Sequence, residues 1–260
     1  NFAFLIPSGK AGFDIFIPLE KLKGAKNGQK AVAKIIEWPA NARNPIGEIQ
    51  DVLGDAGNND AEMHAILAEF ELPYKFPENV DKAAEKIPLE IGDDEIARRR
   101  DMRGVVTFTI DPVDAKDFDD ALSLQKLENG NWEVGVHIAD VTHYVLPNSI
   151  IEEEAQSRAT SVYLVDRVVP MLPERLSNGV CSLRPHENKL CFSAIFELDD
   201  NAKLVGEWFG KTVIYSDRRF TYEEAQDVIE TGEGDFSAEM LTMNRLEELA
   251  FLFLRSGRSV

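Results

Sequence analysis

The sequence predicts an α+β fold in two units, an N-terminal OB-type β-barrel followed by a mixed domain in which helices pack on an antiparallel sheet. Short β-branched and aromatic runs separated by turn residues fill positions 1–54, as is typical of a small barrel. Apolar residues at helical spacing follow from Asp60, and longer alternating runs begin at Val105. We therefore divide the chain into residues 1–72, a partly helical linker at 73–100, and a second unit at 101–260.

The barrel is predicted from four short strands. They cover residues 2–6, 13–17, 31–37 and 46–53. Barrels of this kind hold single-stranded nucleic acid in a basic groove with aromatic stacking platforms. Phe4, Phe13 and Phe16 are candidate platforms, and packing in the barrel core is the alternative that we favour.

The segment between the units is predicted to be helical at first. Met63, Ile66, Leu67 and Phe70 fall at i, i+3, i+4 and i+7, which places them on one face of a helix that Pro73 ends. Residues 73–100 contain three prolines and many charges, which favours a partly helical linker.

The second unit is predicted to combine hairpins and helices. Strands at 121–127 and 132–139 flank Asn129-Gly130, a strong hairpin signal. A second antiparallel pair is expected at 190–198 and 203–214, and a helix at 150–159. Thr221-Tyr222-Glu223-Glu224 has the pattern of a capping box at a helix start. A last helix, with Leu246, Leu249 and Ala250 on one face, is expected to stop at Ser256-Gly257.

Five aspartates lie within ten residues between the first strand of the second unit and its hairpin. They are Asp111, Asp114, Asp117, Asp119 and Asp120. Carboxylates this close repel by roughly 1 kcal/mol per pair at about 4 Å in water, and by more near a protein interior. Solvent offsets this repulsion in an exposed loop, and divalent cations offset it where the carboxylates converge. The apolar runs on both sides favour convergence on Mg²⁺, which prefers oxygen ligands.

Spacing alone excludes some arrangements of these aspartates and leaves others open. An EF-hand counted from Asp117 places Leu122 at the glycine position, and one counted from Asp111 places Lys116 there, so both are excluded. In an extended segment Asp117 and Asp119 share one side, whereas Asp120 faces the other. A cluster of four carboxylates therefore does not follow from spacing.

Four stretches resemble one known family. Residues 110–121, Ile-Asp-Pro-Val-Asp-Ala-Lys-Asp-Phe-Asp-Asp-Ala, are similar to the signature of the ribonuclease II and ribonuclease R family of processive exoribonucleases, which includes the catalytic subunit of the eukaryotic exosome. Residues 65–73, 137–145 and 160–183 also resemble that family. The resemblance covers nearly the whole chain in order, and its first motif has many specified positions.

The resemblance implies a hydrolytic, processive 3′-to-5′ exoribonuclease that uses Mg²⁺ and releases nucleoside 5′-monophosphates. It implies that Asp111, Asp117, Asp119 and Asp120 hold one or two Mg²⁺ at the scissile phosphate, with Asp119 essential for cleavage, and that Asp114 has no such role. Tyr163 matches the family residue that stacks on a base near the RNA 3′ end. The expected partner is single-stranded RNA. Because the family extends beyond both ends of this sequence, we expect the chain alone to bind RNA weakly and cleave it poorly.

Two other function classes remain open. A noncatalytic RNA-binding module derived from the same family is the first alternative. The second is a metal-dependent phosphohydrolase that acts on small phosphate esters.

Composition limits the partners and the compartment. The net charge of −18 argues against a nucleic-acid partner, because proteins that bind phosphates usually carry a basic surface. The distribution of charge along the chain weakens this objection. Four arginines, 98, 99, 100 and 103, precede the acidic stretch, and metal ions invert the charge at such a centre. Cys181 and Cys191 lie among apolar neighbours, so we expect reduced, buried thiols, no disulfide-linked partner and a cytoplasmic protein. No apolar run reaches the roughly 20 residues of a membrane helix.

Several polar residues have two interpretations. His137, Asp140 and His143 form a possible second metal triad, but strand alternation places His137 opposite Asp140, which favours structural roles. Arg167, Arg175 and Arg184 lie on a turn-rich segment, and the sequence does not show which of them meets phosphate. The Arg98-Arg99-Arg100 run is either an RNA contact or an ion-paired helix end.

Overall fold

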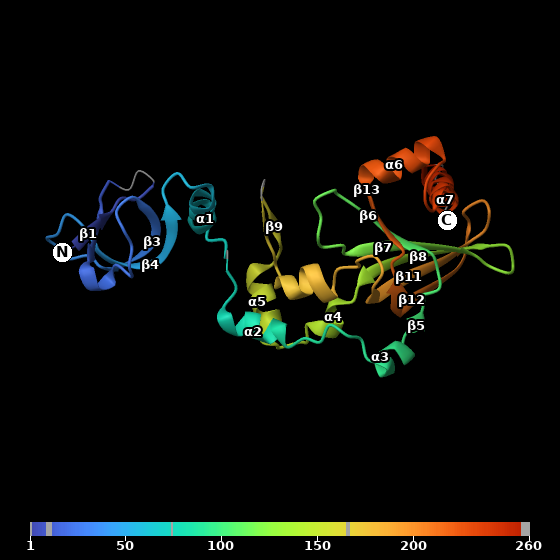
Figure 1. The fold of residues 1–260 in the computed structure, drawn as a ribbon, viewed down its shortest axis with the longest axis horizontal. Helices are drawn as coiled ribbons and strands as arrows, with labels where there is room; N and C mark the ends of the chain where they lie inside the picture. Colours follow the sequence, from blue (N-terminus) through green and yellow to red (C-terminus); the bar gives the residue numbers. More distant parts are fainter. Residues whose placement is uncertain (1, 9–11, 74, 165–166, 256–260) are drawn as a thin grey trace. The chain divides into compact units, whose positions relative to one another are not determined.

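The computed structural model describes residues 2–8, 12–73, 75–164 and 167–255, with the backbone alone described for 251–255. The chain divides into two compact units, residues 1–76 and 77–260 (Figure 1). Most of the predicted linker therefore belongs to the second unit. We describe each unit by itself.

The first unit is a small β-structure with one helix. Its strands are β1 (Phe2–Leu5), β2 (Ile15–Pro18), β3 (Gln29–Glu37) and β4 (Ile46–Asp55), in the order β1-β2-β4-β3, with a 3₁₀ turn at Leu19–Lys21. Ile15, Ile17 and Ile49 form its core. Helix α1 (Asn59–Glu69) follows, and the Asn58 side chain caps it by accepting from the Asp60 amide. This arrangement agrees with the OB-type prediction.

The three phenylalanines singled out in the barrel divide between the two interpretations. Phe13 packs against the Ile15 core and lies 4.7 Å from the Trp38 ring, centroid to centroid. Phe4 and Phe16 instead form a cluster with Phe2, with centroids 5.4 to 5.8 Å apart, and Phe4 is 49% exposed. Core packing therefore holds for Phe13, and two of the three rings remain on the barrel surface.

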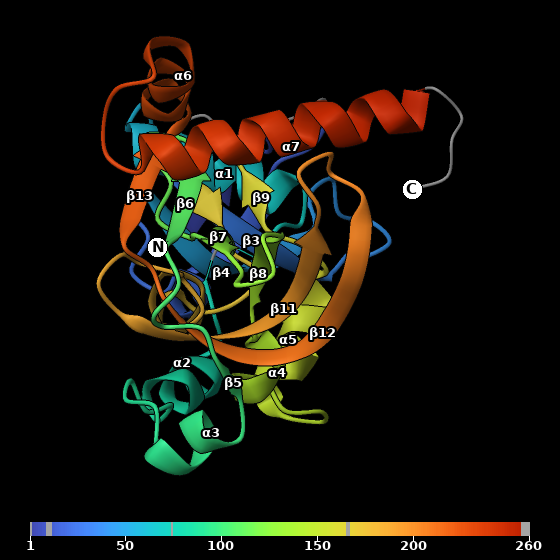
Figure 2. The same ribbon diagram turned by 90° about the vertical axis from the view of Figure 1, so that its right-hand side faces the viewer.

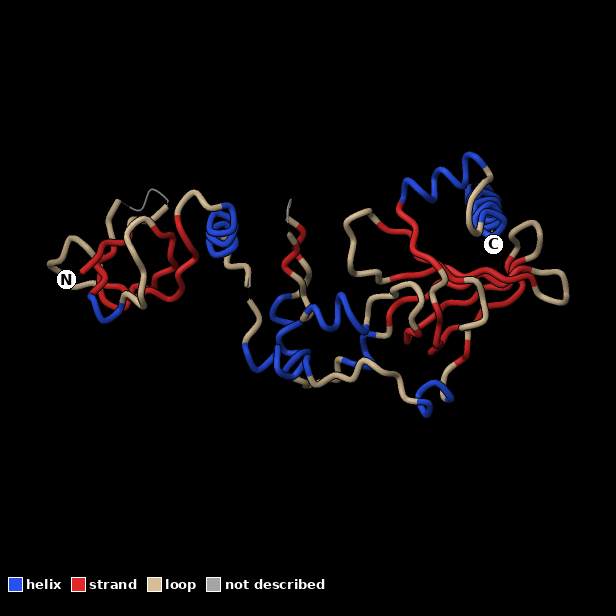
Figure 3. The backbone as a smooth tube through the Cα atoms, in the orientation of Figure 1, coloured by secondary structure: helices blue, strands red, loops and turns tan. Residues whose placement is uncertain are grey.

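The second unit is built on a seven-stranded sheet (Figures 2 and 3). Its strands are β5 (Arg100–Asp101), β6 (Thr107–Asp111), β7 (Asp120–Lys126), β8 (Trp132–Ala139), β11 (Asn188–Leu198), β12 (Leu204–Tyr215) and β13 (Arg218–Thr221). The order is β13-β6-β7-β8-β11-β12-β5. The five central strands are antiparallel, and both short edge strands pair in parallel.

Helices and short strands complete the second unit. They are α2 (Glu78–Glu85), α3 (Asp93–Ala97), α4 (Val141–Tyr144), α5 (Ile150–Arg158), the β9/β10 pair (Val162–Tyr163 and Val168–Val169), a π-helix (Leu176–Val180), α6 (Tyr222–Thr231) and α7 (Ser237–Arg255). Figure 2 shows α7 crossing one face of the sheet. Two buried clusters join α6 and α7 to that face, one around Phe108, Phe220 and Met240, the other around Leu124 and Leu246.

The strongest local predictions hold in the structure. In the hairpin, Leu127 N donates to Asn131 O at 2.9 Å, and Gly130 adopts φ +87°, a conformation that suits glycine. The capping box is present, because Thr221 Oγ1 accepts from Glu224 N at 3.1 Å while Glu224 Oε2 accepts from Thr221 N at 2.8 Å. The predicted stop at Ser256-Gly257 lies outside the described residues.

Both cysteines are buried, free thiols, as expected. Burial raises the pKa of Cys181 to about 12 and raises that of Cys191 as well, so neither thiol ionises near neutral pH. Within the part of the chain that the structure describes, we find no helix with the length and apolar character needed to cross a bilayer.

His137 lies in the middle of the sheet and is fully buried. Its Nδ1 lies 2.7 Å from Ser193 Oγ and its Nε2 lies 2.8 Å from Ser123 Oγ, so two hydroxyls satisfy the ring. Gly135 leaves room for it, because a Cβ at that position would lie 2.6 Å from Nε2. Burial lowers the pKa of His137 from 6.5 to about 4.

This burial predicts a pH-dependent stability. The unfolded chain binds a proton at His137 below pH 6.5 and the folded chain only below about 4, so stability is lost as pH falls through that window. The loss amounts to about 3 kcal/mol. We expect His137→Gln to flatten the fall in unfolding free energy, measured by urea denaturation between pH 7 and 4. His186→Gln, at an exposed position, is the matched control, and equal slopes for His137→Gln and the unaltered protein would contradict the prediction.

Candidate active site

The ends of two neighbouring strands bring the acidic stretch together. Asp111 is the last residue of β6, and Asp120 is the first residue of β7. The antiparallel register, with Phe108 opposite Leu122, places these strand ends side by side. The connection between them carries Asp117 and Asp119, and the Asp119 carbonyl accepts from Ala139 N of β8 at 3.0 Å. Main-chain pairing with two strands therefore positions the stretch.

Asp111 is a buried carboxylate without a complete set of partners. The residue is only 9% exposed, and its Oδ2 has no hydrogen-bond partner among the described residues. Burial raises the pKa of Asp111, and repulsion from Asp120 and Asp117 adds to this shift. Buried charged oxygens are normally paired or coordinate a cation. Asp111 Oδ2 is therefore a candidate ligand for a bound cation.

Asp119 has a strongly raised pKa. Protein atoms around its carboxyl group, and then the charges of Asp117, Asp120 and Asp111, raise the pKa of Asp119 to about 6. The residue as a whole is exposed, so its carboxyl group is accessible to a ligand despite these neighbours. Asp114 is also exposed but is not among the charges that shift Asp119 or Asp111. The charges that raise the pKa of Asp119 and Asp111 therefore belong to the same four aspartates, and Asp114 is not among them.

Tyr163 is joined directly to this group. Its hydroxyl donates to Asp117 Oδ2 at 2.9 Å, while the residue is 64% exposed. The hydrogen bond, followed by burial of the hydroxyl, raises the pKa of Tyr163 to about 12. The hydroxyl is thus held at the aspartates, and most of the ring is free to contact a ligand.

The four aspartates do not form a complete metal cage by themselves. Among the residues with described side chains, no three His, Cys, Asp or Glu groups have the geometry of a metal-binding set. Mg²⁺ is usually held by one or two carboxylates together with water and substrate phosphate, whereas an all-protein cage is typical of Ca²⁺. The unpartnered Oδ2 of Asp111 and the repulsion among the carboxylates fit such an open Mg²⁺ site.

Arg219 is a component of the site that sequence reasoning missed. It lies on β13, which pairs in parallel with β6 so that Arg219 is opposite Thr109. Its guanidinium hydrogen-bonds the Pro112 carbonyl and stacks 5.5 Å from the Phe118 ring centroid, and its charge partly offsets the raised pKa of Asp111. About 110 residues separate β13 from β6 in the sequence, so local patterns carry no signal for this contact.

A basic cavity of about 660 Å³ borders the acidic stretch. It is lined by Leu89, Ala115, Lys116, Phe118, Glu174, Arg175, Asn178, Gly179 and Arg184. Arg175 is engaged structurally, since its Nε and Nη2 both donate to the Ile87 carbonyl, at 3.0 and 2.6 Å. Lys116 and Arg184 are exposed at the cavity. Arg184 also donates to the Asn178 carbonyl, but both Lys116 and Arg184 remain exposed where an anion could reach them.

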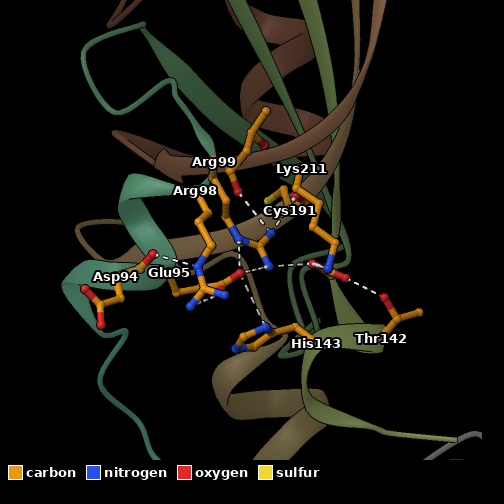
Figure 4. Close-up of polar contacts among 10 residues, drawn as sticks. Asp94, Glu95, Arg98, Arg99, Thr142, His143, Cys191 and Lys211 are labelled. Carbon is orange, nitrogen blue, oxygen red and sulfur yellow. Dashed lines mark hydrogen bonds and ion pairs between the residues drawn. The ribbon is translucent and has the colours of Figure 1, made fainter.

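Arg99 organises a buried ionic network behind the site (Figure 4). Its Nη2 lies 2.7 Å from Asp140 Oδ2 and 2.7 Å from Glu95 Oε1, and its Nη1 donates to the Cys191 and Thr212 carbonyls. Burial alone favours a neutral acid, but hydrogen bonds from Thr142 and Arg99 hold the pKa of Asp140 below its usual value. The network joins α3 to the ends of β8, β11 and β12.

The possible second metal triad is not assembled. His137 is held between two serines, Asp140 is bound to Arg99, and His143 Nδ1 lies 3.6 Å from Glu95 Oε1. Each side chain has a structural partner, as strand alternation favoured. The arginine run is likewise ion-paired: Arg98 and Arg99 pair with Glu95, and Arg100 pairs with Glu133, although the Arg98 side chain remains 72% exposed.

Comparison with known proteins places this site in a family. The RNB domain model matches residues 99–257, and a cold shock domain model matches residues 4–77. The chain belongs to the RNB family. Ribonuclease R of Thermotoga maritima is 41% identical over 233 residues, which cover 88% of this chain and 33% of the relative. DIS3-like exonuclease 2 of Schizosaccharomyces pombe is 45% identical over 199 residues, 76% of this chain and 22% of the relative.

Solved structures show the same fold. Mycoplasma genitalium RNase R in complex with double-stranded RNA matches with a TM-score of 0.81 at 25% identity, over 95% of this chain and 46% of that chain. Yeast Ssd1, described as a pseudonuclease, matches with a TM-score of 0.68 at 22% identity, over 99% of this chain and 33% of that chain. This RNB chain spans about a third or less of the length of these curated relatives. The fold is thus shared with an RNase R and with a pseudonuclease.

The Arg99 network predicts a large effect for a small substitution. Asp140→Asn removes one of the two carboxylates that pair with a fully buried guanidinium, so we expect a loss of about 3 to 5 kcal/mol in the free energy of unfolding. Guanidinium denaturation followed by circular dichroism measures it. Asp94→Asn, at an exposed position in the same region, should change stability by less than about 0.5 kcal/mol. Equal stability of the two variants would contradict the assignment.

Proposed function

We propose that this RNB chain takes part in hydrolytic, processive 3′-to-5′ degradation of single-stranded RNA in the cytoplasm, with Mg²⁺ as the cofactor and nucleoside 5′-monophosphates as products. The observation that carries the proposal is the group of four aspartates, in which Asp111 keeps a buried, unpartnered oxygen and Asp119 has a raised pKa. The family supports it, because the relatives are named as ribonucleases and exonucleases.

In this proposal Asp111, Asp117, Asp119 and Asp120 hold the metal. Bound Mg²⁺ would supply positive charge next to the scissile phosphate and to the attacking and leaving oxygens. Asp111 contributes from the buried end of β6 and Asp120 from the start of β7, so the sheet determines their separation. Asp119, the most accessible of the strongly shifted carboxyls, is the residue whose loss stops cleavage.

Several groups in the two units suit a single strand of RNA. Tyr163 offers an exposed ring beside Asp117, where it can stack on the base nearest the reacting phosphate. Phe2 and Phe4 offer exposed rings on the barrel, and stacking of this kind accepts any base. Lys116 and Arg184 offer cations at the cavity beside the acidic stretch for the phosphate backbone. Such local cations could bind RNA phosphates even though the chain as a whole is acidic.

A noncatalytic RNA-binding role is the second candidate, and the likeness to Ssd1 favours it because the same fold occurs in a protein described as a pseudonuclease. Catalysis and binding place different demands on the aspartates, because RNA binding alone does not require a buried carboxylate without a partner. A phosphohydrolase for small esters differs in substrate and would act on mononucleotides without preference for a polymer. Because the chain is about a third of its relatives' length, we propose that residues 1–260 alone bind RNA weakly and cleave it poorly.

Asp119→Asn separates cleavage from binding. In the intact protein we expect release of mononucleotides from a uniformly labelled single-stranded RNA to fall by about 10² to 10³, because several kcal/mol of charge stabilisation are lost. RNA affinity, measured by fluorescence anisotropy, should change by less than about threefold. Asp114→Asn is the matched control and should keep full activity. Normal cleavage by Asp119→Asn, or no Mg²⁺-dependent release by the unaltered protein, would overturn the catalytic role.

Tyr163 variants test the stacking role. Tyr163→Ala removes a ring contact worth about 1 to 3 kcal/mol, so we expect the dissociation constant for single-stranded RNA to rise about 5- to 100-fold. Tyr163→Phe keeps the ring and loses only the hydrogen bond to Asp117, so its affinity should stay within about twofold. Both are measured by anisotropy in the Asp119→Asn background to prevent cleavage. Equal affinities of the alanine and phenylalanine variants would contradict stacking.

A further inference from the structure

We propose that Ser182 is a positioning residue for Asp117, and that it acts through the main chain on both sides of that aspartate. The inference rests on the proposed function, because it assigns a role in the same site. Ser182 lies about 65 residues from the acidic stretch in the sequence and is fully buried. It touches no reacting group, so its effect is on geometry.

The Ser182 hydroxyl bridges two main-chain groups that flank Asp117. Its Oγ donates to the Lys116 carbonyl at 2.9 Å and accepts from the Phe118 amide at 3.1 Å. The next residue adds a third bond, from Leu183 N to Phe118 O at 2.8 Å. Residues 182–183 therefore hold the chain immediately before and after Asp117, and the serine hydroxyl is the only side chain in this set of contacts.

A hydroxyl suits this position because it can donate one hydrogen bond and accept others at the same time. An alanine offers neither, and a buried main-chain group that loses its partner forces the surrounding chain to move or to admit water. Ser182 is 0% exposed, so its hydroxyl has these main-chain groups as partners rather than bulk water. Two of the three bonds that hold the backbone around Asp117 consequently come from this hydroxyl.

The segment that carries Ser182 is itself firmly held. It follows the π-helix Leu176–Val180, and Ser182 N donates to Gly179 O at 3.2 Å. The ammonium of Lys189, a buried residue of β11, donates to the same Gly179 carbonyl at 2.8 Å. Cys181 and Leu183, on either side of the serine, are buried. The segment with Ser182 is therefore tied to β11 through Lys189, and Ser182 connects the acidic stretch to it.

A displaced Asp117 would change two interactions in the site. Its Oδ2 receives the Tyr163 hydroxyl, and its charge contributes to the raised pKa of Asp119. Residues that orient metal ligands commonly alter metal affinity or activity by 10- to 100-fold when they are lost. We therefore infer that Ser182 affects metal binding and turnover more than affinity for RNA.

The test compares Ser182→Ala with Ser193→Ala in the intact protein. Ser193 is equally buried and lies on β11, where its hydroxyl contacts His137 and Thr212 and not the acidic stretch, so its loss controls for stability. Binding of Mn²⁺ is measured by calorimetry, hydrogen exchange of residues 115–120 by mass spectrometry, and kcat and KM on a single-stranded RNA. Ser182→Thr retains the hydroxyl, and Ser182→Cys is used if the alanine variant does not fold.

We expect Ser182→Ala to weaken Mn²⁺ binding and lower kcat by about 10-fold or more, with KM within about twofold and faster exchange at 115–120. Ser193→Ala should leave all three unchanged, and Ser182→Thr should restore them. Unchanged Mn²⁺ binding in Ser182→Ala, or an equal effect in Ser193→Ala, would overturn the inference. Mn²⁺ binding without RNA hydrolysis by the unaltered protein would overturn only the proposed function, whereas absence of Mn²⁺ binding would overturn both.

Discussion

Repulsion among four carboxylates is the constraint on which the second unit depends. Asp119 is surrounded by the charges of three other aspartates, and Asp111 carries a buried oxygen with no partner. Such an arrangement persists only where the backbone is held on several sides. Here β6 and β7 hold its two ends, β8 receives the Asp119 carbonyl, and residues 182–183 hold the part around Asp117. Strain at the centre is thus balanced by main-chain pairing around it.

The residues that support the site also carry buried charges, but these charges are paired. Arg99 is surrounded by Asp140, Glu95 and two carbonyls, and Lys189 is shared between Glu187 and the Gly179 carbonyl. Buried ions of this kind stabilise little by themselves, yet they penalise any arrangement that separates them. The site differs in that Asp111 Oδ2 has no hydrogen-bond partner among the described residues.

Local features could be predicted from the sequence, and long-range ones could not. The Asn129-Gly130 hairpin and the Thr221 capping box depend on a few adjacent residues, and both are present. The α+β class and the RNB family also followed, because motifs and alternating runs are local. Arg219, Ser182 and the Asp140 partner of Arg99 come from segments about 40 to 110 residues away, so no spacing rule reaches them. The placement of Asp111 and Asp120 at neighbouring strand ends likewise depends on the register between β6 and β7.

The parallel edge strand β13 has a consequence for how the molecule tolerates change. Thr221 sits opposite Asp111 in the register and is also the residue that begins α6. Thr221 therefore links the apolar core beneath α6 and α7 to the end of β6, where Asp111 is buried. Volume changes among Phe220, Val228 and Met240 would therefore shift the backbone at Thr221, and with it the end of β6 that carries Asp111.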